Sequence, residues 1–284
     1  GSVKMCIRDR ETGHQEVAAE YYKKAQNYRN LFYPEKGFMW AKDTNGKWRD
    51  NFDATEWGGP FTEGCSWHWT WSVFHDPEGL SSLLGGHELM AGRLDSMFVA
   101  PNTFNYGTYG FVIHEIAEMV ALNMGQYAHG NQPVQHAIYL YNYVGQPWKA
   151  QYHTRNVMNK LYNSGPEGYC GDEDNGQTSA WYVFTALGFY PVCPGASEYV
   201  LGSPLFPKAT LSLPGEKTFT IDAEGVSDTN CYIRSAELNA KGFTRNYLKH
   251  EELVGGGEFR LVMDSVPNRE RGIHLEDFPY SYSK

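Results

Sequence analysis

The sequence predicts a mainly helical protein with a β region at its C-terminal end. Before residue 190, most segments repeat apolar residues every three or four positions, which is the spacing of one helix face. After Pro191 the pattern changes to short apolar runs separated by Gly, Pro, Asn and Asp, which is typical of strands and turns. The connections between the expected helices carry most of the polar and aromatic residues. This arrangement fits helical hairpins in a toroid whose loops build a site at one end.

The helical pattern predicts about six helices. Pro133 and Pro147 stand where the first turn of a helix tolerates proline, and Gly188 ends the last helical segment. The pair Asn45 and Gly46, in an aromatic loop after the first helix, predicts a hairpin. The expected helices are 14–32, 77–94, 111–124, 133–143, 148–162 and 178–187.

We expect three parts along the chain. The first is a leader at residues 1–10, where Gly1 and Ser2 resemble a tag scar and VKMCIRDR resembles translated adaptor sequence, so that the chain begins inside a longer gene. A helical domain at 11–192 follows, and an antiparallel, sandwich-like β domain at 193–284 packs tightly on it. The expected strands are 198–201, 209–213, 219–223, 231–235, 246–248 and 259–263.

Composition excludes several classes of protein. The chain of 284 residues has 24 Lys and Arg against 33 Asp and Glu, with no basic run, which argues against a nucleic-acid partner. No segment approaches the roughly 20 apolar residues of a membrane span. The 5 Cys include no CxxC pair, so neither a zinc cluster nor a disulfide framework is expected. Aromatic residues make up 15%, and they serve either as core side chains or as faces on which sugar rings stack.

Glu63 is a candidate general acid. It stands in FTEGCSWHWTW, directly before Trp67 and Trp69. A carboxyl group among indole rings is desolvated, which raises its pKa and suits it to donate a proton near neutral pH. The alternative is a glutamate that only caps a loop.

Two further stretches carry polar groups that suit a sugar or a cation. Glu115, beside His114, and Glu118 are neighbours on one helix face and could bind a sugar hydroxyl or a cation, or form ion pairs with Arg or Lys. The turn with Asn131 and Gln132 is rich in oxygen atoms of the kind that Ca²⁺ prefers, although it also reads as an ordinary start of a helix.

The Gly-flanked turn GDEDNG supplies a second group of carboxylates. Asp172 and Asp174 stand two residues apart there, so both can point into one pocket. One acid desolvated by aromatic rings and another in a polar turn would give the division of roles found in glycosidases. No nucleophile elbow, P-loop or dinucleotide fingerprint is present.

Several of these motifs together resemble glycoside hydrolase family 92, a family of calcium-dependent, inverting, exo-acting α-mannosidases. The resemblance rests on TEGCSWHWTWSVFHD, YGFVIHEIAEM, AHGNQPVQHAIYLYNYVGQPWKAQ and GYCGDEDNGQTSAWYVFTALGFYPVCP, and it covers residues 14–284 in one order. It implies part of an (α/α)6 toroid, α-mannoside glycans such as mannobiose, high-mannose N-glycans or yeast mannan as substrates, and export from a bacterial cell to the periplasm or beyond. No signal peptide stands in this chain.

The resemblance also implies roles for individual residues. Glu63 matches the general acid, and Asp172 and Asp174 match the acidic pair that activates water. His114 and Glu115 match the pair that lines the leaving-sugar subsite of members that prefer α-1,2 linkages. The implied ligands of Ca²⁺ are Asn131, Gln132 and Asp174, and Trp67 and Trp69 would line the pocket.

The chain departs from the family pattern in two respects. The acidic turn, which often reads Gly-Asn-Asp-Asp in the family, is a variant here that keeps spaced acids, Asp172 and Asp174. Family members also place a β-sandwich domain before twelve ring helices, so this chain is expected to be a C-terminal fragment on which that missing domain packs. The alternatives are hydrolysis of a mannosyl phosphodiester, an inactive mannose-binding fragment, and another toroid hydrolase, such as a glucoside-acting one, which would lack the calcium turn.

Overall fold

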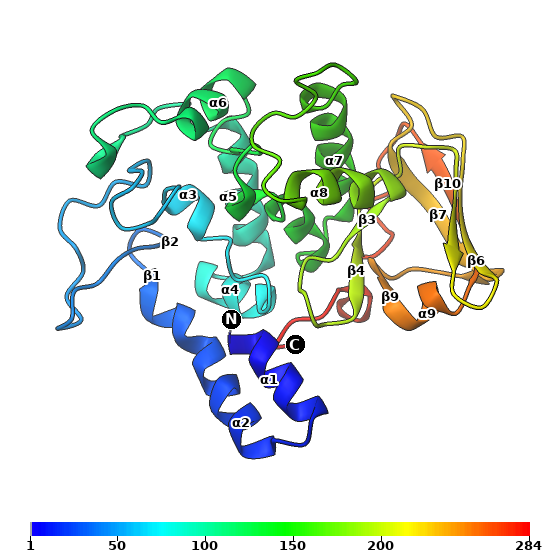
Figure 1. The fold of residues 1–284 in the computed structure, drawn as a ribbon, viewed down its shortest axis with the longest axis horizontal. Helices are drawn as coiled ribbons and strands as arrows, with labels where there is room; N and C mark the ends of the chain where they lie inside the picture. The colour runs from blue at the N-terminus through cyan, green and yellow to red at the C-terminus, as the bar shows by residue number, and fades with distance from the viewer. Residues whose placement is uncertain (1) are drawn as a thin grey trace.

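The computed structural model describes residues 2–284, with side chains from Ile7 onward. It has a helical part, an N-terminal helical hairpin that projects from it, and a β part beside it (Figure 1). Among the described residues no helix is long and apolar enough to cross a membrane. The four cysteines whose side chains are described are free thiols.

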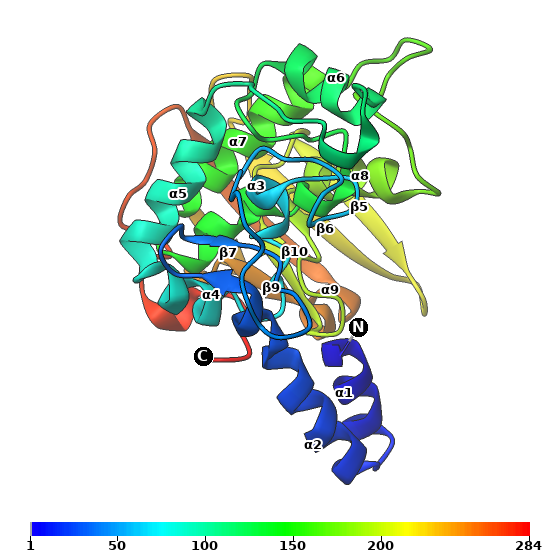
Figure 2. The same cartoon turned by 90° about the vertical axis from the view of Figure 1, so that its left-hand side faces the viewer.

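The projecting hairpin consists of α1 (Ser2–Glu11) and α2 (Gln15–Lys24), and it stands away from the rest in both views (Figures 1 and 2). A 3₁₀ segment, η1 (Ala25–Leu31), continues α2 toward the main body. Ser2–Glu11 is thus helical, and the expectation that residues 1–10 are a leader outside the fold stays a prediction. Gly13, at φ 83°, makes the turn, and the buried Asp9 accepts the backbone N–H of His14 at 2.7 Å.

The helical part contains more breaks than periodicity predicts. The expected helix 77–94 is two helices, α4 (Pro77–Leu84) and α5 (His87–Val99), because Gly85 adopts φ 95° and ends the first. The expected helix 133–143 is two 3₁₀ segments, η3 (Gln132–Val134) and η4 (Ala137–Tyr143). The remaining helical elements are α3 (Ser66–Trp69), η2 (Gly107–Tyr109), α6 (His114–Leu122), α7 (Pro147–Leu161) and α8 (Gln177–Leu187).

Short strands precede these helices. β1 (Phe32–Tyr33) pairs with β2 (Phe38–Met39), and a bridge between Lys42 and Trp48 confirms the hairpin predicted from Asn45 and Gly46.

The β part contains two sheets. The larger has the strand order β5 (Lys208–Leu213), β6 (Lys217–Glu224), β10 (Gly257–Asp264), β7 (Tyr232–Leu238) and β8 (Lys241–Gly242). The smaller consists of β3 (Phe189–Tyr190), β4 (Glu198–Leu201) and β9 (Tyr247–Lys249), and the short helical elements α9 (His250–Val254) and η5 (Leu275–Asp277) follow. The pairings β5–β6, β10–β7, β7–β8, β3–β4 and β4–β9 are antiparallel as expected, whereas β10 pairs with β6 in parallel, which corrects the expectation for this pair.

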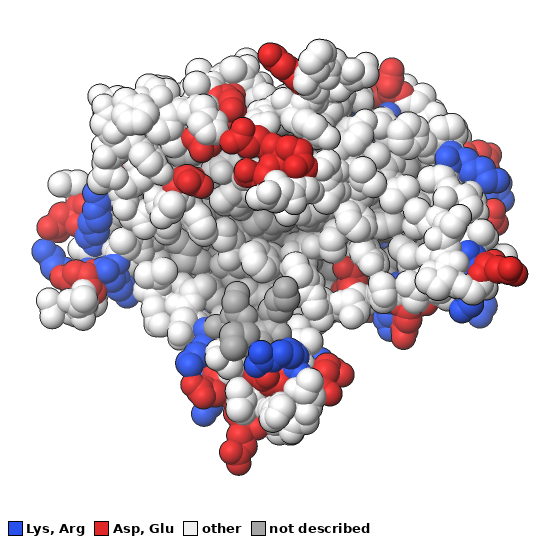
Figure 3. Space-filling model, viewed as in Figure 1, with Lys and Arg blue, Asp and Glu red and all other residues white. Residues whose placement is uncertain are grey.

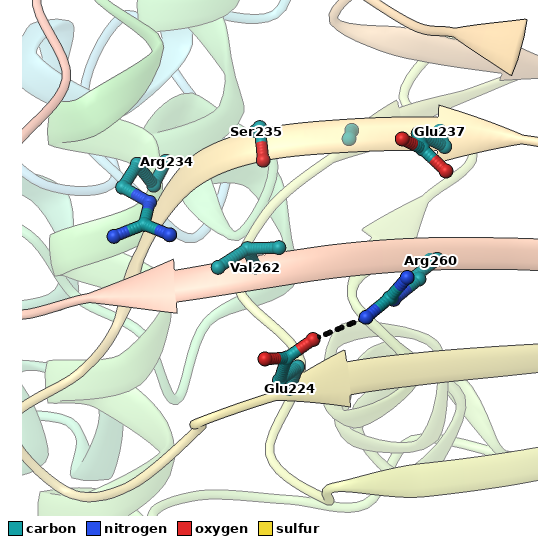
Figure 4. Close-up of a pocket in the computed structure, with 7 residues that line it drawn as sticks. Glu224, Arg234, Ser235, Glu237, Arg260 and Val262 are labelled. Atoms are coloured by element: carbon teal, nitrogen blue, oxygen red, sulfur yellow. Dashed lines mark hydrogen bonds and ion pairs between the residues drawn. The ribbon is translucent and has the colours of Figure 1, made fainter.

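The two sheets share one apolar core, as the sandwich-like expectation requires. Phe219 and Phe259 of the larger sheet pack in the same buried cluster as Phe189 and Leu248 of the smaller. Residues of β6, β7 and β10 line a charged groove of about 210 Å³, in which Arg260 and Glu224 pair at 2.6 Å (Figure 4).

Buried polar contacts join the β part to the helical part. Arg155 of α7 donates to the carbonyl oxygens of Pro204 at 2.6 Å and Ser227 at 3.0 Å. Gln151 of the same helix accepts the backbone N–H of Ile233 at 3.0 Å. These groups are satisfied only while the two parts stay together, so they fix the relative position of the sheets and α7.

Asp76 ties the C-terminal segment to the start of the helical part. Its side chain is fully buried and caps α4 by accepting the backbone N–H of Gly79 at 3.1 Å. It also accepts the hydroxyl groups of Tyr28 at 2.7 Å, Ser281 at 2.9 Å and Ser283 at 2.8 Å. Burial raises the pKa of this carboxyl, but the hydrogen bonds from these hydroxyl groups outweigh it and the net pKa is lowered.

We predict that Asp76→Asn lowers the free energy of unfolding by about 2–4 kcal/mol at neutral pH, because the charged acceptor of several buried hydrogen bonds is lost. The difference from wild type should shrink as pH falls from the ordinary pKa of 3.8 toward the lower pKa of the folded protein, since the unfolded chain then binds a proton that the native carboxylate does not. Urea denaturation at several pH values measures this. Asp50→Asn, at an exposed position, should change stability by less than about 0.5 kcal/mol.

Candidate functional site

The candidate residues lie on separate connections that meet at one end of the molecule. α6 and the connection from α7 to α8 lie at the end opposite the α1–α2 hairpin in both views (Figures 1 and 2). The side-chain amide of Asn131 donates to the backbone carbonyl of Glu63 at 2.5 Å. The amide of the next residue, Gln132, donates to the backbone carbonyl of Asp172 at 3.4 Å. Two consecutive residues thus tie the loop of the expected acid to the loop of the expected base.

Two glycines allow the Asn131 turn to cross the Asp172 turn at close range. A Cβ atom on Gly130 would lie 2.5 Å from the carbonyl oxygen of Cys170, and one on Gly171 would lie 2.6 Å from that of Gly130. Real Cβ atoms do not approach backbone so closely, so both positions require glycine. The hydroxyl of Thr178, in the first turn of α8, donates to the Asp172 carbonyl at 2.9 Å and fixes the far side of the turn.

His114 gathers three carboxylates at this crossing. Its Nδ1 lies 3.2 Å from Glu118, and its Nε2 lies 3.3 Å from Glu115 and 3.8 Å from Asp172. The hydrogen bond to Glu118 and the charges of all three carboxylates raise the pKa of His114. Figure 3 shows acidic side chains gathered on the face between α6 and the connection to α8. Of the alternatives for Glu115 and Glu118, ion pairing with Arg or Lys is not seen among the described residues, and both contact His114.

Left-handed backbone marks both acidic loops. Glu63 has φ 45° and Asp174 has φ 51°, with Asn175 next to it at φ 54°. This region is sparsely populated by residues other than glycine, and Glu is less common there than Asn or Asp. Strained backbone of this kind gathers at functional sites, where the surrounding structure holds it in place.

The surroundings of Glu63 differ from the expectation. In the described chain Glu63 is exposed, so the expected desolvation by indole rings is not seen. The indole N–H of Trp69 donates to the carbonyl of Thr62 at 3.0 Å, which holds Trp69 beside the acid loop. Trp67 instead packs edge-on against Phe38 at 4.8 Å, within the apolar core.

A buried, neutral histidine, His129, directly precedes Gly130 and holds that side of the crossing in place. His129 is fully buried, and its ring nitrogens lie 2.7 Å from the hydroxyl of Tyr127 and 2.8 Å from that of Tyr162. Burial lowers the pKa of His129 to about 3, so the ring is uncharged near neutral pH. Trp181 of α8 packs on the same ring at 4.2 Å, which joins α8 to the Asn131 turn.

The oxygen atoms of Asn131, Gln132 and Asp174 could supply part of the ligand shell of a hard cation. The amide N–H groups of Asn131 and Gln132 are used by protein oxygens, so each amide keeps its oxygen as a possible ligand, and Asp174 adds an exposed carboxylate. Amide and carboxylate oxygens are what Ca²⁺ prefers, but a complete shell needs about six to eight of them. In the described part of the chain no three His, Cys, Asp or Glu side chains form a metal-binding group, so a calcium site here depends on amides and further oxygens.

Two supporting contacts, of Tyr109 with Glu63 and of Glu118 with His114, were not expected from the sequence. Tyr109 accepts the backbone N–H of Glu63 at 3.0 Å through its hydroxyl, and no local pattern links residues so far apart. Glu118 was noted as a neighbour of Glu115 but was not assigned to the site. Its position four residues after His114, on the same helix face, was the available signal.

Comparison with known proteins identifies one family. The profile of the glycosyl hydrolase family 92 catalytic domain matches residues 6–265. A solved family 92 inverting mannosidase from Bacteroides thetaiotaomicron is 72% identical, with a TM-score of 0.89, and the match covers 100% of this chain and 38% of that one. A family 92 α-mannosidase from the same organism, solved with mannoimidazole, is 31% identical, with a TM-score of 0.88 and coverage of 97% and 36%.

One curated relative also matches. It is an uncharacterized secreted glycosidase from Arthroderma benhamiae, 26% identical over an alignment of 270 residues that covers 86% of this chain and 32% of the relative. This chain therefore spans about a third of the length of the proteins it matches.

We predict that Gly171→Ala lowers the free energy of unfolding by about 1–3 kcal/mol, because the added methyl group overpacks the crossing. Urea denaturation measures the change. Gly92→Ala is the matched control, since a Cβ atom there meets nothing within 4 Å in the helix α5. It should leave stability unchanged or raise it by up to about 1 kcal/mol. Equal stability of the two variants would contradict the need for glycine at position 171.

Proposed function

Because this chain belongs to glycosyl hydrolase family 92, we propose that its parent protein is an exo-acting, inverting α-mannosidase. We further propose that it uses Ca²⁺ and cleaves α-1,2-linked mannosides from glycans such as mannobiose, high-mannose N-glycans or yeast mannan. The bridge that Asn131 and Gln132 form between the backbones of Glu63 and Asp172 carries the proposal, because it holds together the two separate loops that bear the carboxylates.

Glu63 is the proposed general acid, and it gives its proton to the glycosidic oxygen as the bond breaks. Asp172 or Asp174 is the proposed base, which takes a proton from a water molecule on the opposite face of the sugar. Inversion requires the two carboxyl groups to stand about 6.5–9.5 Å apart, which leaves room for that water. The left-handed backbone at Glu63 and Asp174 supports assigning both loops to the chemistry.

His114 and Glu115 are the proposed contacts of the leaving sugar. Both lie at the start of α6, and Nε2 of His114 lies 3.8 Å from the Asp172 carboxylate. A sugar bound between the acid and the base would therefore contact them. Trp69, beside the acid loop, is proposed to line the pocket. Trp67 is also proposed to line the pocket, although its ring packs against Phe38.

Asn131, Gln132 and Asp174 would hold the calcium ion. When bound, the ion would orient sugar hydroxyls and act as a Lewis acid. The amide N–H groups of Asn131 and Gln132 hold the Glu63 and Asp172 loops together. Their amide oxygens stay available as ligands for the ion.

The parent protein is proposed to complete the site. The helices of this chain would form part of an (α/α)6 toroid, and a preceding β-sandwich domain would pack on it and cover the exposed Glu63 and Asp172. The name of the secreted relative supports export of the parent protein to the periplasm or beyond.

A mannose-binding fragment without activity is the second candidate for this chain by itself. The observation that favours it is the exposure of Glu63, Asp172 and Asp174 in a chain that spans about a third of its relatives. Hydrolysis of a mannosyl phosphodiester is less favoured, because such a leaving group needs little protonation and Glu63 would be superfluous. Calorimetry with mannose and a turnover assay on the same sample separate binding from catalysis.

We predict that Glu63→Gln in the complete gene product lowers kcat/KM for mannobiose by about 10²–10⁴-fold, as loss of a general acid does. An aryl α-mannoside with an activated leaving group needs no proton and should lose less than about 10-fold. Glu216→Gln, at an exposed turn, is the control and should change neither rate. Equal losses on the two substrates would remove the acid role from Glu63.

We predict that chelation by EDTA lowers mannobiose hydrolysis by about 10-fold or more, and that added Ca²⁺ restores it while Mg²⁺ does not, because Mg²⁺ demands a smaller, stricter shell. Ca²⁺ should also raise the unfolding temperature, since it binds only the folded site. Asn131→Ala should require more Ca²⁺ for both effects. Hydrolysis that is unaffected by chelation would refute the calcium proposal.

A further inference from the structure

The His114 ring needs an anchor if it is to face a bound sugar. Its side chain is 58% exposed, and an exposed imidazole can turn through several rotamers. The carboxylates that face it are Glu115 and Glu118 from α6 and Asp172 from the connection to α8. Only one of them contacts Nδ1, and that one is Glu118 at 3.2 Å.

Glu118 is much better held than His114. Its side chain is 29% exposed, and its Oε2 atom is buried with no hydrogen-bond partner among the described residues. That oxygen lies against the glycine crossing, 2.8 Å from where a Cβ of Gly130 would stand and 2.9 Å from where one of Gly171 would stand. Glu118 therefore touches the backbones of both site turns with one oxygen and His114 with the other.

The protonation behaviour of the pair agrees with this geometry. Burial raises the pKa of Glu118 more than His114 lowers it, whereas the hydrogen bond to Glu118 is the main cause of the raised pKa of His114. Glu118, the more buried of the two side chains, therefore holds the more exposed His114 ring in place. With Nδ1 held by Glu118, Nε2 is directed toward Glu115 and Asp172.

We propose that Glu118 is a positioning residue: it orients His114 in the leaving-sugar subsite and holds that subsite in register with the Gly130–Gly171 crossing. This inference rests on the proposed mannosidase function and adds a residue to it. Glu118 touches neither the expected acid nor the broken bond, and its effect passes through His114.

The test uses Glu118→Gln in the complete gene product, because glutamine keeps the shape and removes the charge. NMR titration of selectively labelled histidine, with the His114 signal assigned by His114→Gln, should show a lower His114 pKa, because the hydrogen bond to a charged carboxylate is lost. kcat/KM for mannobiose should fall by about 10-fold, while the rate on an activated aryl α-mannoside stays within about 2-fold, because only mannobiose places a sugar against His114.

Glu78→Gln is the matched control, because Glu78 contacts His87 at 2.7 Å and its side chain is about as exposed as that of Glu118. It should leave the His114 titration and both rates unchanged. An unchanged His114 pKa in Glu118→Gln overturns the proposal, and so does an equal loss of rate on both substrates. A wild-type protein that cleaves neither substrate refutes the proposed function, and the titration then still decides whether Glu118 holds His114.

Discussion

The close contact between the backbones of Gly130 and Gly171 is the constraint on which the candidate site depends. It brings the turn that carries Asn131 against the turn that carries Asp172, with Glu118 packed beneath both. Side-chain amides then tie the second turn and the Glu63 loop to the first. Because a methyl group at either glycine would meet backbone atoms, the arrangement has little room to adjust, as a site that must hold two loops at a set separation requires.

The crossing is stable because rigid elements lie below it. His129 is buried and neutral between two tyrosine hydroxyl groups and the Trp181 ring, so the turn before Asn131 has no freedom to move without breaking those contacts. Farther away, Arg155 ties the β part to α7. As a result, Glu63, Asp172 and Asp174 stand exposed above a tightly packed set of side chains.

Much of the fold could be predicted from the sequence, and the failures have physical causes. Helix periodicity located α6, α7 and α8, and turn residues located most strands of the larger sheet. Periodicity could not show the break at Gly85, because the apolar pattern continues across it. Parallel pairing of β10 with β6 could not be predicted either, because strand order is set by tertiary packing and the alternation of residues is the same in both directions.

By itself, the sequence determined the kinds of chemistry available and where they stand along the chain: an acid in the Glu63 loop, a pair of acids in the Asp172 turn and an oxygen-rich turn at Asn131. The tertiary structure decided which of these meet, through hydrogen bonds between residues far apart in the chain. It also showed that Glu63 is exposed in this chain, although neighbouring tryptophans in the sequence suggested a desolvated acid. The reason is that Glu63 lies in the loop before α3 while the Trp67 ring, on α3, packs against Phe38, so proximity in the sequence does not bring that ring to the carboxyl.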